Sequence, residues 1–474
     1  MNTRQCPYTR RREPEMNRQR LLLFSAVLAL SFAGCTAVRP DYAARVATGT
    51  TAHDICSETF VSGQQPDTIF AETLASRPGL NLIAPLISYR VDRSRREVSA
   101  SLAGAFTSRA VYRGAWGCTV VHDADAASLE LPQPLSPIAQ VSLPLALDAS
   151  PMLSHALDDE FAEEPSEASR RTKAVVVLYK GRLIAERYAR GYGPDTPILG
   201  FSIGKSVTNA LVGVLVREGK LSIDAPVQLD NGSGRSVPLS DFMRMTSGLD
   251  IDETGSGFDP SNRVMYVYTR DMAAAASRAR AIAVPGQRWA YSSASVHLVA
   301  RMVRDAVGGN AANVQRFAHD ELFAPLGMRH VTMEMDETGT PVGAHYMLAS
   351  ARDWGRFGEL YLNDGVAPNG QRILPEDWVR WSTTPTLATN YGAGWWVNRR
   401  SRTSNGQPDG MPLMPDAPAD TFYALGNLGQ YIIVVPSKQL VIVRLGNAQT
   451  PHFDIGGADR LVKEVIVALP DASS

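Results

Sequence analysis

The sequence has few cysteines, few lysines and almost no net charge. Among its 474 residues are four cysteines and six lysines, and the formal net charge at pH 7 is −1. No block of basic residues occurs after the N-terminal segment, so nothing in the sequence favours nucleic-acid binding. The hydrophobic content of 44% is sufficient for a large core. We therefore expect a globular protein of two or three domains whose partner is a small molecule.

The sequence also lacks the residue spacing of a metal site. His297, His319 and His330 have no partners at metal-ligand spacing. The acidic residues between positions 241 and 253 are interpreted as a polar loop. We expect neither a metal nor a cofactor.

The first 34 residues have the order of an export signal. Arginines precede an apolar run at residues 21–32, which is too short to span a bilayer. The run leads to an Ala-Gly-Cys triplet ending at Cys35, which resembles the bacterial lipoprotein signal, in which this cysteine is lipidated. Phe32 departs from the usual aliphatic residue, so ordinary cleavage near residue 33 is the alternative. Met16 as the start would leave a conventional short basic segment. We predict a periplasmic protein or a membrane-anchored lipoprotein.

The rest of the chain divides near residue 150. Residues 35–150 form a small N-terminal region with no recognisable chemistry, and residues 151–474 form the larger domain. Two cysteines remain in the mature N-terminal region, Cys56 and Cys118. Because an exported pair of cysteines favours one disulfide, we predict that they are joined. The alternative is two unpaired buried thiols.

One stretch carries candidate chemistry, the Ser-x-x-Lys motif of Ser202 and Lys205. Apolar residues recur at helical spacing from Ser202 until Gly219, which predicts a helix with Ser202 in its first turn. Residues three positions apart share a helix face, so Lys205 could lie beside the Ser202 hydroxyl. The motif alone is weak, and a helix-capping serine followed by an exposed lysine is the competing interpretation.

Two further motifs follow in order. Pro-Gly precedes a Tyr-x-Ser turn at Tyr291 and Ser293, and a glycine motif at residues 426–430 opens a late strand. Together with Ser202 and Lys205, these resemble the class C β-lactamase and esterase superfamily. The resemblance implies a β-lactamase/transpeptidase-like α+β fold, with an antiparallel sheet flanked by helices and an all-helical subdomain.

Within that superfamily the chain resembles the 6-aminohexanoate-dimer hydrolase group over residues 54–470. The similar phrases lie at residues 205–213, 351–358, 391–396 and 425–430. Three positions depart from the expected pattern. Ser293 stands in place of asparagine, Asn427 in place of lysine or histidine, and His345 in place of serine. These departures affect the expected substrate more than the nucleophile.

The resemblance implies a role for each motif. Ser202 would be the nucleophile, Lys205 its activator and Tyr291 the general acid and base. The backbone N–H groups of Ser202 and Gln430 would form the oxyanion hole, and Gly429 would let the substrate approach the strand closely.

Four side chains are expected to contact substrate. They are Ser293, Asn427, Trp395 and Trp396. Adjacent residues of a strand point to opposite faces, so at most one of the two tryptophans is expected to line the pocket.

Apolar hairpins near both ends of the larger domain also predict α+β structure. They lie at residues 174–188 and 430–445, and an amphipathic helix follows at residues 459–469. One antiparallel sheet could contain both hairpins and return the end of the chain to the Ser202 helix.

The sequence therefore predicts an exported serine hydrolase that cleaves an amide or ester through an acyl-enzyme on Ser202. It does not rank amidase against esterase activity, and it makes no prediction of oligomeric state. A penicillin-interacting β-lactamase or peptidase is one alternative, and a non-catalytic surface lipoprotein that binds ligands is another.

Overall fold

The computed structural model describes residues 40–74, 80–122, 129–141, 143–145, 150–163, 169–251, 253, 263–399, 412–449 and 451–469. The predicted signal segment, including Met16 and Cys35, lies outside these ranges. Within them, no helix is both long enough and apolar enough to cross a membrane.

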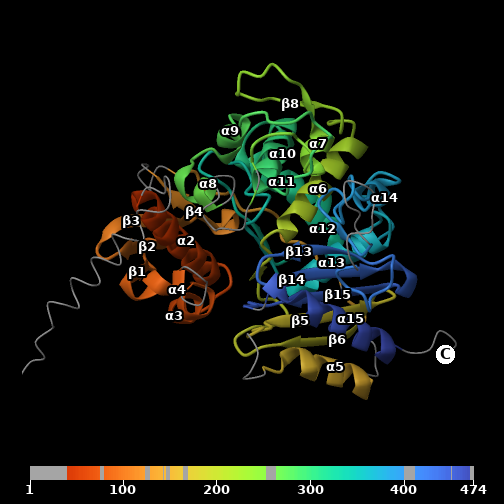
Figure 1. The fold of residues 1–474 in the computed structure, drawn as a ribbon. Helices are drawn as coiled ribbons and strands as arrows, with labels where there is room; N and C mark the ends of the chain where they lie inside the picture. Colours follow the sequence, from red (N-terminus) through yellow and green to blue (C-terminus); the bar gives the residue numbers. More distant parts are fainter. Residues whose placement is uncertain are drawn as a thin grey trace, which may run out of the picture. The chain divides into compact units, whose positions relative to one another are not determined.

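A six-stranded antiparallel sheet forms the centre of the larger domain (Figure 1). Its strands, in spatial order, are β12 (Trp396–Val397), β13 (Phe422–Gly426), β14 (Gln430–Val435), β15 (Leu440–Leu445), β5 (Ala174–Tyr179) and β6 (Arg182–Tyr188). Strand β15 pairs with β5, with Leu440 opposite Tyr179 and Leu445 opposite Ala174. This pairing confirms that both predicted hairpins belong to one sheet.

Both faces of this sheet are covered, because alternate side chains of each strand point to opposite sides. Val176 belongs to the core beneath α13 (Ala351–Leu362). Val177 points the other way, toward the side chains of α5 (Pro151–Phe161) and α15 (Ile455–Ala468). The strands are therefore apolar on both faces, which explains their nearly continuous hydrophobic runs.

Helices dominate the part of the larger domain beyond the β13 side of the sheet (Figure 1). Helix α6 (Ile203–Arg217) packs against α10 (Ser293–Ala306). The other helices of this part are α7 (Leu239–Met243), α8 (Arg263–Tyr268), α9 (Met272–Ser277), α11 (Ala311–Ala318), α12 (Ala324–Leu326) and α14 (Trp378–Ser382). A short pair, β8 (Pro226–Val227) and β9 (Val237–Pro238), lies beside them. The predicted α+β fold with a helical subdomain is confirmed.

A three-stranded sheet places the Ser-x-x-Lys motif beside a distant loop. In it, β11 (Met347–Ala349) pairs with both β10 (Val331–Met333) and β7 (Ile198–Leu199). Strand β7 leads into the turn that begins α6, and the loop of residues 334–346 leads into β11. The sheet therefore brings residues about 140 positions apart to the same place.

The N-terminal region has its own small sheet and a covering helix. The sheet order is β1 (Ile87–Asp92), β2 (Glu97–Leu102), β3 (Ala105–Tyr112) and β4 (Cys118–Val121). The helices are α2 (Pro40–Phe60), α3 (Pro66–Ile69) and α4 (Leu80–Ile83). Cys56 of α2 and Cys118 of β4 form a disulfide with an S–S distance of 1.94 Å. Both cysteines are buried in the core of this region.

Buried Glu334 joins the N-terminal region to the loop of residues 334–346. Its carboxylate accepts hydrogen bonds from Ser57 Oγ at 2.7 Å and from the Cys118 backbone N–H at 2.9 Å. It also pairs with His53 Nε2 at 2.8 Å. Burial by itself would lower the pKa of His53, but Glu334 and Asp54 raise it to about 10. The buried ion pair of His53 and Glu334 therefore connects the N-terminal region to this loop.

Candidate active site

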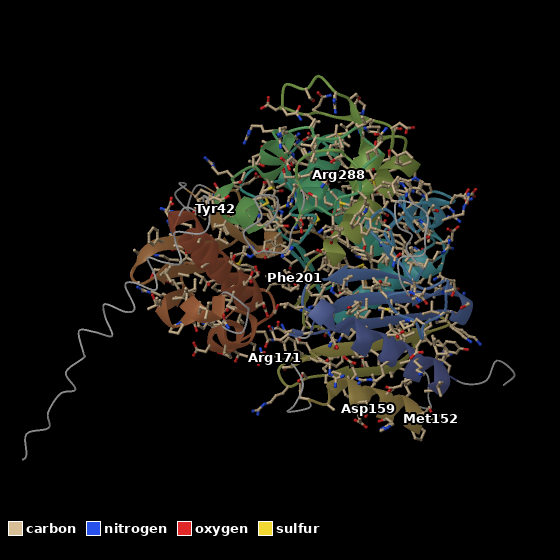
Figure 2. All side chains as sticks on the ribbon, viewed as in Figure 1. Tyr42, Met152, Asp159, Arg171, Phe201 and Arg288 are labelled. Carbon is tan, nitrogen blue, oxygen red and sulfur yellow. A yellow bond between two sulfur atoms is a disulfide. The ribbon has the colours of Figure 1, made fainter. Side chains whose placement is uncertain are left out.

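Ser202 lies on the turn between β7 and α6. The preceding Phe201, labelled in Figure 2, has a left-handed backbone with φ +48°, which is uncommon for a bulky residue and recurs at functional sites. Ser202 occupies the N-cap position, but its side chain makes no capping hydrogen bond. Its Oγ instead accepts a hydrogen bond from Lys205 Nζ at 2.9 Å. The geometry thus favours the nucleophile interpretation over the capping serine.

Lys205 is buried and held by three oxygen acceptors. Its Nζ donates to Ser202 Oγ, to Ser293 Oγ at 3.1 Å and to the Ala344 carbonyl at 3.1 Å. Only 3% of the residue is exposed. Burial lowers the pKa of Lys205 to about 8, and the nearby charge of Glu253 opposes that shift. Because of this lowered pKa, a useful fraction of Lys205 is neutral near physiological pH and can accept a proton.

Tyr291 lies against both members of the pair. The Lys205 Nζ is 4.7 Å from the centre of the Tyr291 ring. Burial and the charge of Glu253 raise the pKa of Tyr291 well above its usual range, while the neighbouring Ser202 side chain opposes this shift. Tyr291 therefore keeps its proton at neutral pH, so it is suited to passing a proton on rather than to acting as a phenolate.

Ser293 does not occupy the substrate-facing place predicted for it. It is the first residue of α10 and is 1% exposed. Its Oγ accepts the hydrogen bond from Lys205, and its backbone N–H donates to the carboxylate of Glu253. The prediction of a substrate contact is corrected, because this short side chain is used to hold the lysine.

The glycine motif forms the hairpin between β13 and β14, beside the Ser202 turn. Gly426 pairs with Gln430 across the hairpin. A Cβ atom on Gly426 would lie 2.1 Å from the Gly200 carbonyl oxygen, so only glycine allows this close approach. Asn427 is partly exposed in the loop. The end of β13 is therefore in contact with the turn that presents Ser202.

Gly429 and Gln430 fix the conformation of this hairpin through contacts inside the protein. Gly429 has φ +81°, and a Cβ atom there would lie 2.2 Å from the guanidinium of Arg444. The close approach of Arg444 therefore requires glycine here, and the predicted approach of substrate stays a prediction. The buried side-chain amide of Gln430 donates to the carbonyls of Asn427, Leu428 and Gly446. The oxyanion role of its backbone N–H, with that of Ser202, stays a prediction.

Trp396 lies in an aromatic cluster around Tyr291. Its ring stacks on that of Tyr291 at 5.7 Å and contacts Tyr391 edge-on at 5.0 Å. Trp289 completes the cluster, 6.3 Å from Trp396. Trp396 is partly exposed, so this cluster provides an apolar wall next to the catalytic candidates.

Trp395 points to the other side, and its predicted substrate contact is wrong. The residue is 0% exposed. Its ring packs against Tyr361 at 4.4 Å, Phe422 at 5.2 Å and Phe357 at 6.1 Å. Because adjacent residues in extended backbone point to opposite sides, the two tryptophans are expected to separate. Only the structure shows which of them lies next to Tyr291.

Three neighbours of this group have no motif of their own in the sequence. They are the Ala344 carbonyl, Glu253 and His345, whose ring lies edge-on to Phe201 at 5.1 Å. In the sequence, His345 stands out only as a departure from the family pattern, and Glu253 only as part of a polar loop. No local pattern could have identified them, because each reaches the site through long-range packing.

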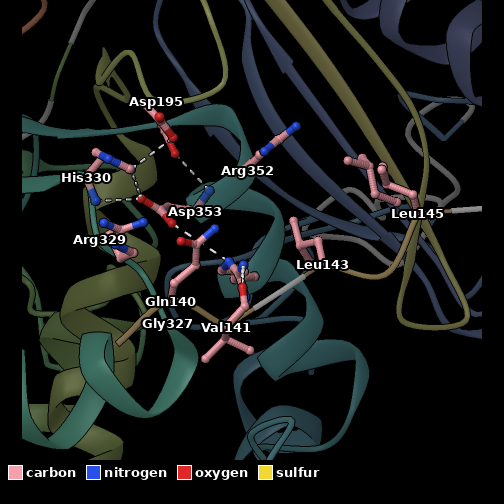
Figure 3. Close-up of a pocket in the computed structure, with 13 residues that line it drawn as sticks. Gln140, Val141, Leu143, Leu145, Asp195, Gly327, Arg329, His330, Arg352 and Asp353 are labelled. Atoms are coloured by element: carbon pink, nitrogen blue, oxygen red, sulfur yellow. Dashed lines mark hydrogen bonds and ion pairs between the residues drawn. The ribbon is translucent and has the colours of Figure 1, made fainter. Parts of the chain in front are cut away.

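The cavity in Figure 3 lies elsewhere. It has a volume of about 170 Å³ and is lined by charged residues that include Asp195, His330, Arg352 and Asp353. None of the predicted catalytic residues lines it. His330 lies 3.6 Å from both Asp195 and Asp353, and Arg352 is paired with Glu186. His330 and Arg352 therefore have acidic partners at or next to this cavity, and the cavity is not the site formed around Ser202.

A family model matches the part of the chain that contains this fold and these candidate catalytic residues. The family model described as Beta-lactamase matches residues 157–466, which include Ser202, Lys205, Tyr291 and the 426–430 hairpin. The chain belongs to the beta-lactamase family.

Three comparisons show which known proteins this chain is similar to. A 6-aminohexanoate-dimer hydrolase of Paenarthrobacter ureafaciens is 27% identical over 229 residues, covering 44% of this chain and 56% of that protein. The match thus spans little more than half the length of that relative. A Bacillus anthracis protein provisionally named 6-aminohexanoate-dimer hydrolase shares the fold with a TM-score of 0.54 and 23% identity, covering 70% of this chain and 88% of its own.

The third comparison is with the solved structure of another hydrolase. EstCE1, described as a hydrolase with promiscuous acyltransferase activity, has a TM-score of 0.51 and 14% identity. The similarity covers 66% of this chain and 98% of that structure. At these identities the two solved structures establish the fold alone.

Proposed function

We propose that this protein is an exported serine hydrolase that cleaves an amide or ester bond through an acyl-enzyme on Ser202. The observation that carries the proposal is the 2.9 Å hydrogen bond between Lys205 Nζ and a Ser202 Oγ that is not used to cap its helix. The lowered pKa of Lys205 and the adjacent Tyr291 hydroxyl add the means to move a proton.

The first step forms the bond between Ser202 Oγ and the carbonyl carbon of the substrate. The serine proton passes to neutral Lys205, and the carbonyl π electrons move to the oxygen. Backbone N–H groups of Ser202 and Gln430 are proposed to stabilise that oxyanion. The bond to the leaving nitrogen or oxygen then breaks, and the Lys205 proton reaches the leaving atom through the Tyr291 hydroxyl.

The second step reverses this proton movement. A water molecule attacks the acyl carbon and gives its proton to the Lys205–Tyr291 pair. Ser202 leaves and takes a proton back, so the enzyme is regenerated and the acid product is released. Tyr291 can serve both steps because it gains one proton as it gives up another.

We further propose that the substrate is uncharged where it meets the 426–430 hairpin. Asn427 offers an amide there in place of a cation that would attract a carboxylate. The aromatic cluster of Trp289, Tyr391 and Trp396 supports an apolar acyl or leaving group. Linear amides and short-chain esters that are uncharged at this point both satisfy these conditions. The Paenarthrobacter relative is named for the hydrolysis of a 6-aminohexanoate dimer.

A labelling experiment tests the proposed nucleophile. A fluorophosphonate probe should label the wild-type protein on Ser202, and the protein should hydrolyse a short-chain nitrophenyl ester. Ser202→Ala should abolish both reactions while leaving the melting temperature within a few degrees. Hydrolysis that persists in Ser202→Ala would exclude the mechanism, and rapid nitrocefin turnover by the wild type would redirect the substrate class to β-lactams.

Export and lipidation are part of the same proposal. The order of basic residues, apolar run and Cys35 supports an anchored lipoprotein, and the Cys56–Cys118 disulfide fits an oxidising compartment. Metabolic labelling with a palmitate analogue should mark the wild type but not Cys35→Ala. Equal labelling of both proteins would contradict the anchor.

A further inference from the structure

Glu253 makes two contacts with the segment that carries Tyr291 and Ser293. Its backbone N–H donates to the Tyr291 carbonyl at 3.2 Å. Its carboxylate accepts a hydrogen bond from the Ser293 backbone N–H. The two contacts involve the residues on either side of Ser292. They therefore hold the whole Tyr-x-Ser turn against the segment that carries Glu253.

The turn held in this way presents both side chains to Lys205. Ser293 Oγ accepts a hydrogen bond from Lys205 Nζ, and the Tyr291 ring lies beneath the same nitrogen. A shift of the turn would move both contacts together. Glu253 therefore acts on Lys205 indirectly, through its hydrogen bond with Ser293.

The position also suits a negative charge. Ser293 is the first residue of α10, where backbone N–H groups lack partners within the helix and a carboxylate is favourable. Ser292 caps the same helix through a hydrogen bond from Ser295 N at 3.3 Å. Glu253 thus adds a charged acceptor to a helix end that also faces a buried lysine.

The other titratable groups near Lys205 do not supply this charge. His297 of α10 is buried, and burial together with Lys205 lowers its pKa to about 3, so it is neutral. Tyr291 and Tyr391 have raised pKa values because of burial, and they are neutral as well. Among the described residues, Glu253 is the carboxylate whose charge acts on Lys205.

We propose that Glu253 is a positioning residue whose backbone and carboxylate hold the Tyr291–Ser293 turn against Lys205 and bring a negative charge to the helix end that contacts this lysine. The proposal rests on the proposed function of Ser202 and Lys205. Since neutral Lys205 accepts the serine proton, removal of the charge should extend activity toward lower pH.

The test separates the charge from the hydrogen bond. Glu253→Gln keeps an oxygen acceptor for the Ser293 N–H but removes the charge. The acidic limb of the kcat/KM profile for nitrophenyl ester hydrolysis should move to lower pH by about 0.5–1 unit. Glu253→Ala loses the acceptor too and should lower kcat by about tenfold or more at the optimum pH.

Asp250→Asn is the matched control. Asp250 is a neighbouring carboxylate that is 49% exposed and pairs with Arg280 at the surface, so its pH profile should equal that of the wild type. An unchanged acidic limb in Glu253→Gln would overturn the role of the charge, and full activity in Glu253→Ala would overturn the positioning role.

Fluorophosphonate labelling keeps the two proposals distinguishable. If the wild type is neither labelled nor active, the proposed function fails. If the wild type is labelled on Ser202 and active but the Glu253 variants behave as the wild type does, only the role of Glu253 fails. Should Glu253→Ala not fold, the pH profile of Glu253→Gln decides the outcome.

Discussion

Lys205 donates a hydrogen bond of 2.9 Å to Ser202 within a single turn at the start of α6. The lysine reaches the serine because residues three positions apart lie on one side of a helix. Its other two acceptors, Ser293 and Ala344, come from positions far away in the chain. The pair is therefore local in origin, but its orientation and burial depend on the tertiary structure.

Replacement of Lys205 should remove the base without removing the nucleophile. Lys205→Ala is expected to lower kcat/KM for ester hydrolysis by about 10²–10⁴, the usual contribution of a positioned base. Lys205→Arg should be nearly as inactive, because arginine stays protonated. Lys220→Ala is the control, since Lys220 is 53% exposed and pairs with Glu218. Full activity in Lys205→Arg would contradict the assignment of a proton acceptor.

Activity should rise with pH through the neutral range. The pKa of Lys205 is lowered to about 8, and only the neutral amine accepts the serine proton. Activity should therefore fall as the pH drops below about 8 and level off above it. The raised pKa of Tyr291 keeps its proton in place across this range. A kcat/KM profile between pH 5 and 10 that is flat on its acidic side would disagree with this assignment.

Loss of Trp395 should mainly lower stability, whereas loss of Trp396 should mainly weaken substrate binding. Trp395→Ala leaves a cavity in the core between α13 and the sheet, and should lower the free energy of unfolding by about 3–5 kcal/mol. Trp396→Ala removes a partly exposed wall next to Tyr291, and should raise KM with a smaller loss of stability. Urea unfolding and steady-state kinetics on both variants measure the two effects. A larger loss of stability in Trp396→Ala would reverse the assignment of faces.

The disulfide should stabilise the protein against unfolding. It closes a loop between residues 62 positions apart, and replacing both Cys56 and Cys118 by serine should lower the free energy of unfolding by about 2–4 kcal/mol. Urea unfolding with and without reductant measures this difference. Reductant should destabilise the wild type and leave the double variant unchanged, and any equal effect on both would show that the bond is not the cause.

Local sequence patterns were sufficient for several parts of this protein. Period-two and apolar runs predicted both hairpins, and helical spacing predicted α6 with Ser202 at its start. These elements follow from interactions between near neighbours in the chain. The order of the three motifs also indicated the family, and the match of the family model over residues 157–466 confirms it.

The sequence by itself therefore determined the fold class, the hairpins and the serine–lysine pair. Only the tertiary structure decided which tryptophan faces Tyr291, why Gly429 must be glycine, and that Ser293 and Glu253 serve Lys205. The physical reason is distance along the chain. Ala344 meets Lys205 only after the three-stranded sheet brings remote segments together, and Arg444 meets Gly429 only once β14 and β15 are paired. Burial then sets the pKa of Lys205, and burial is a property of the whole packed domain.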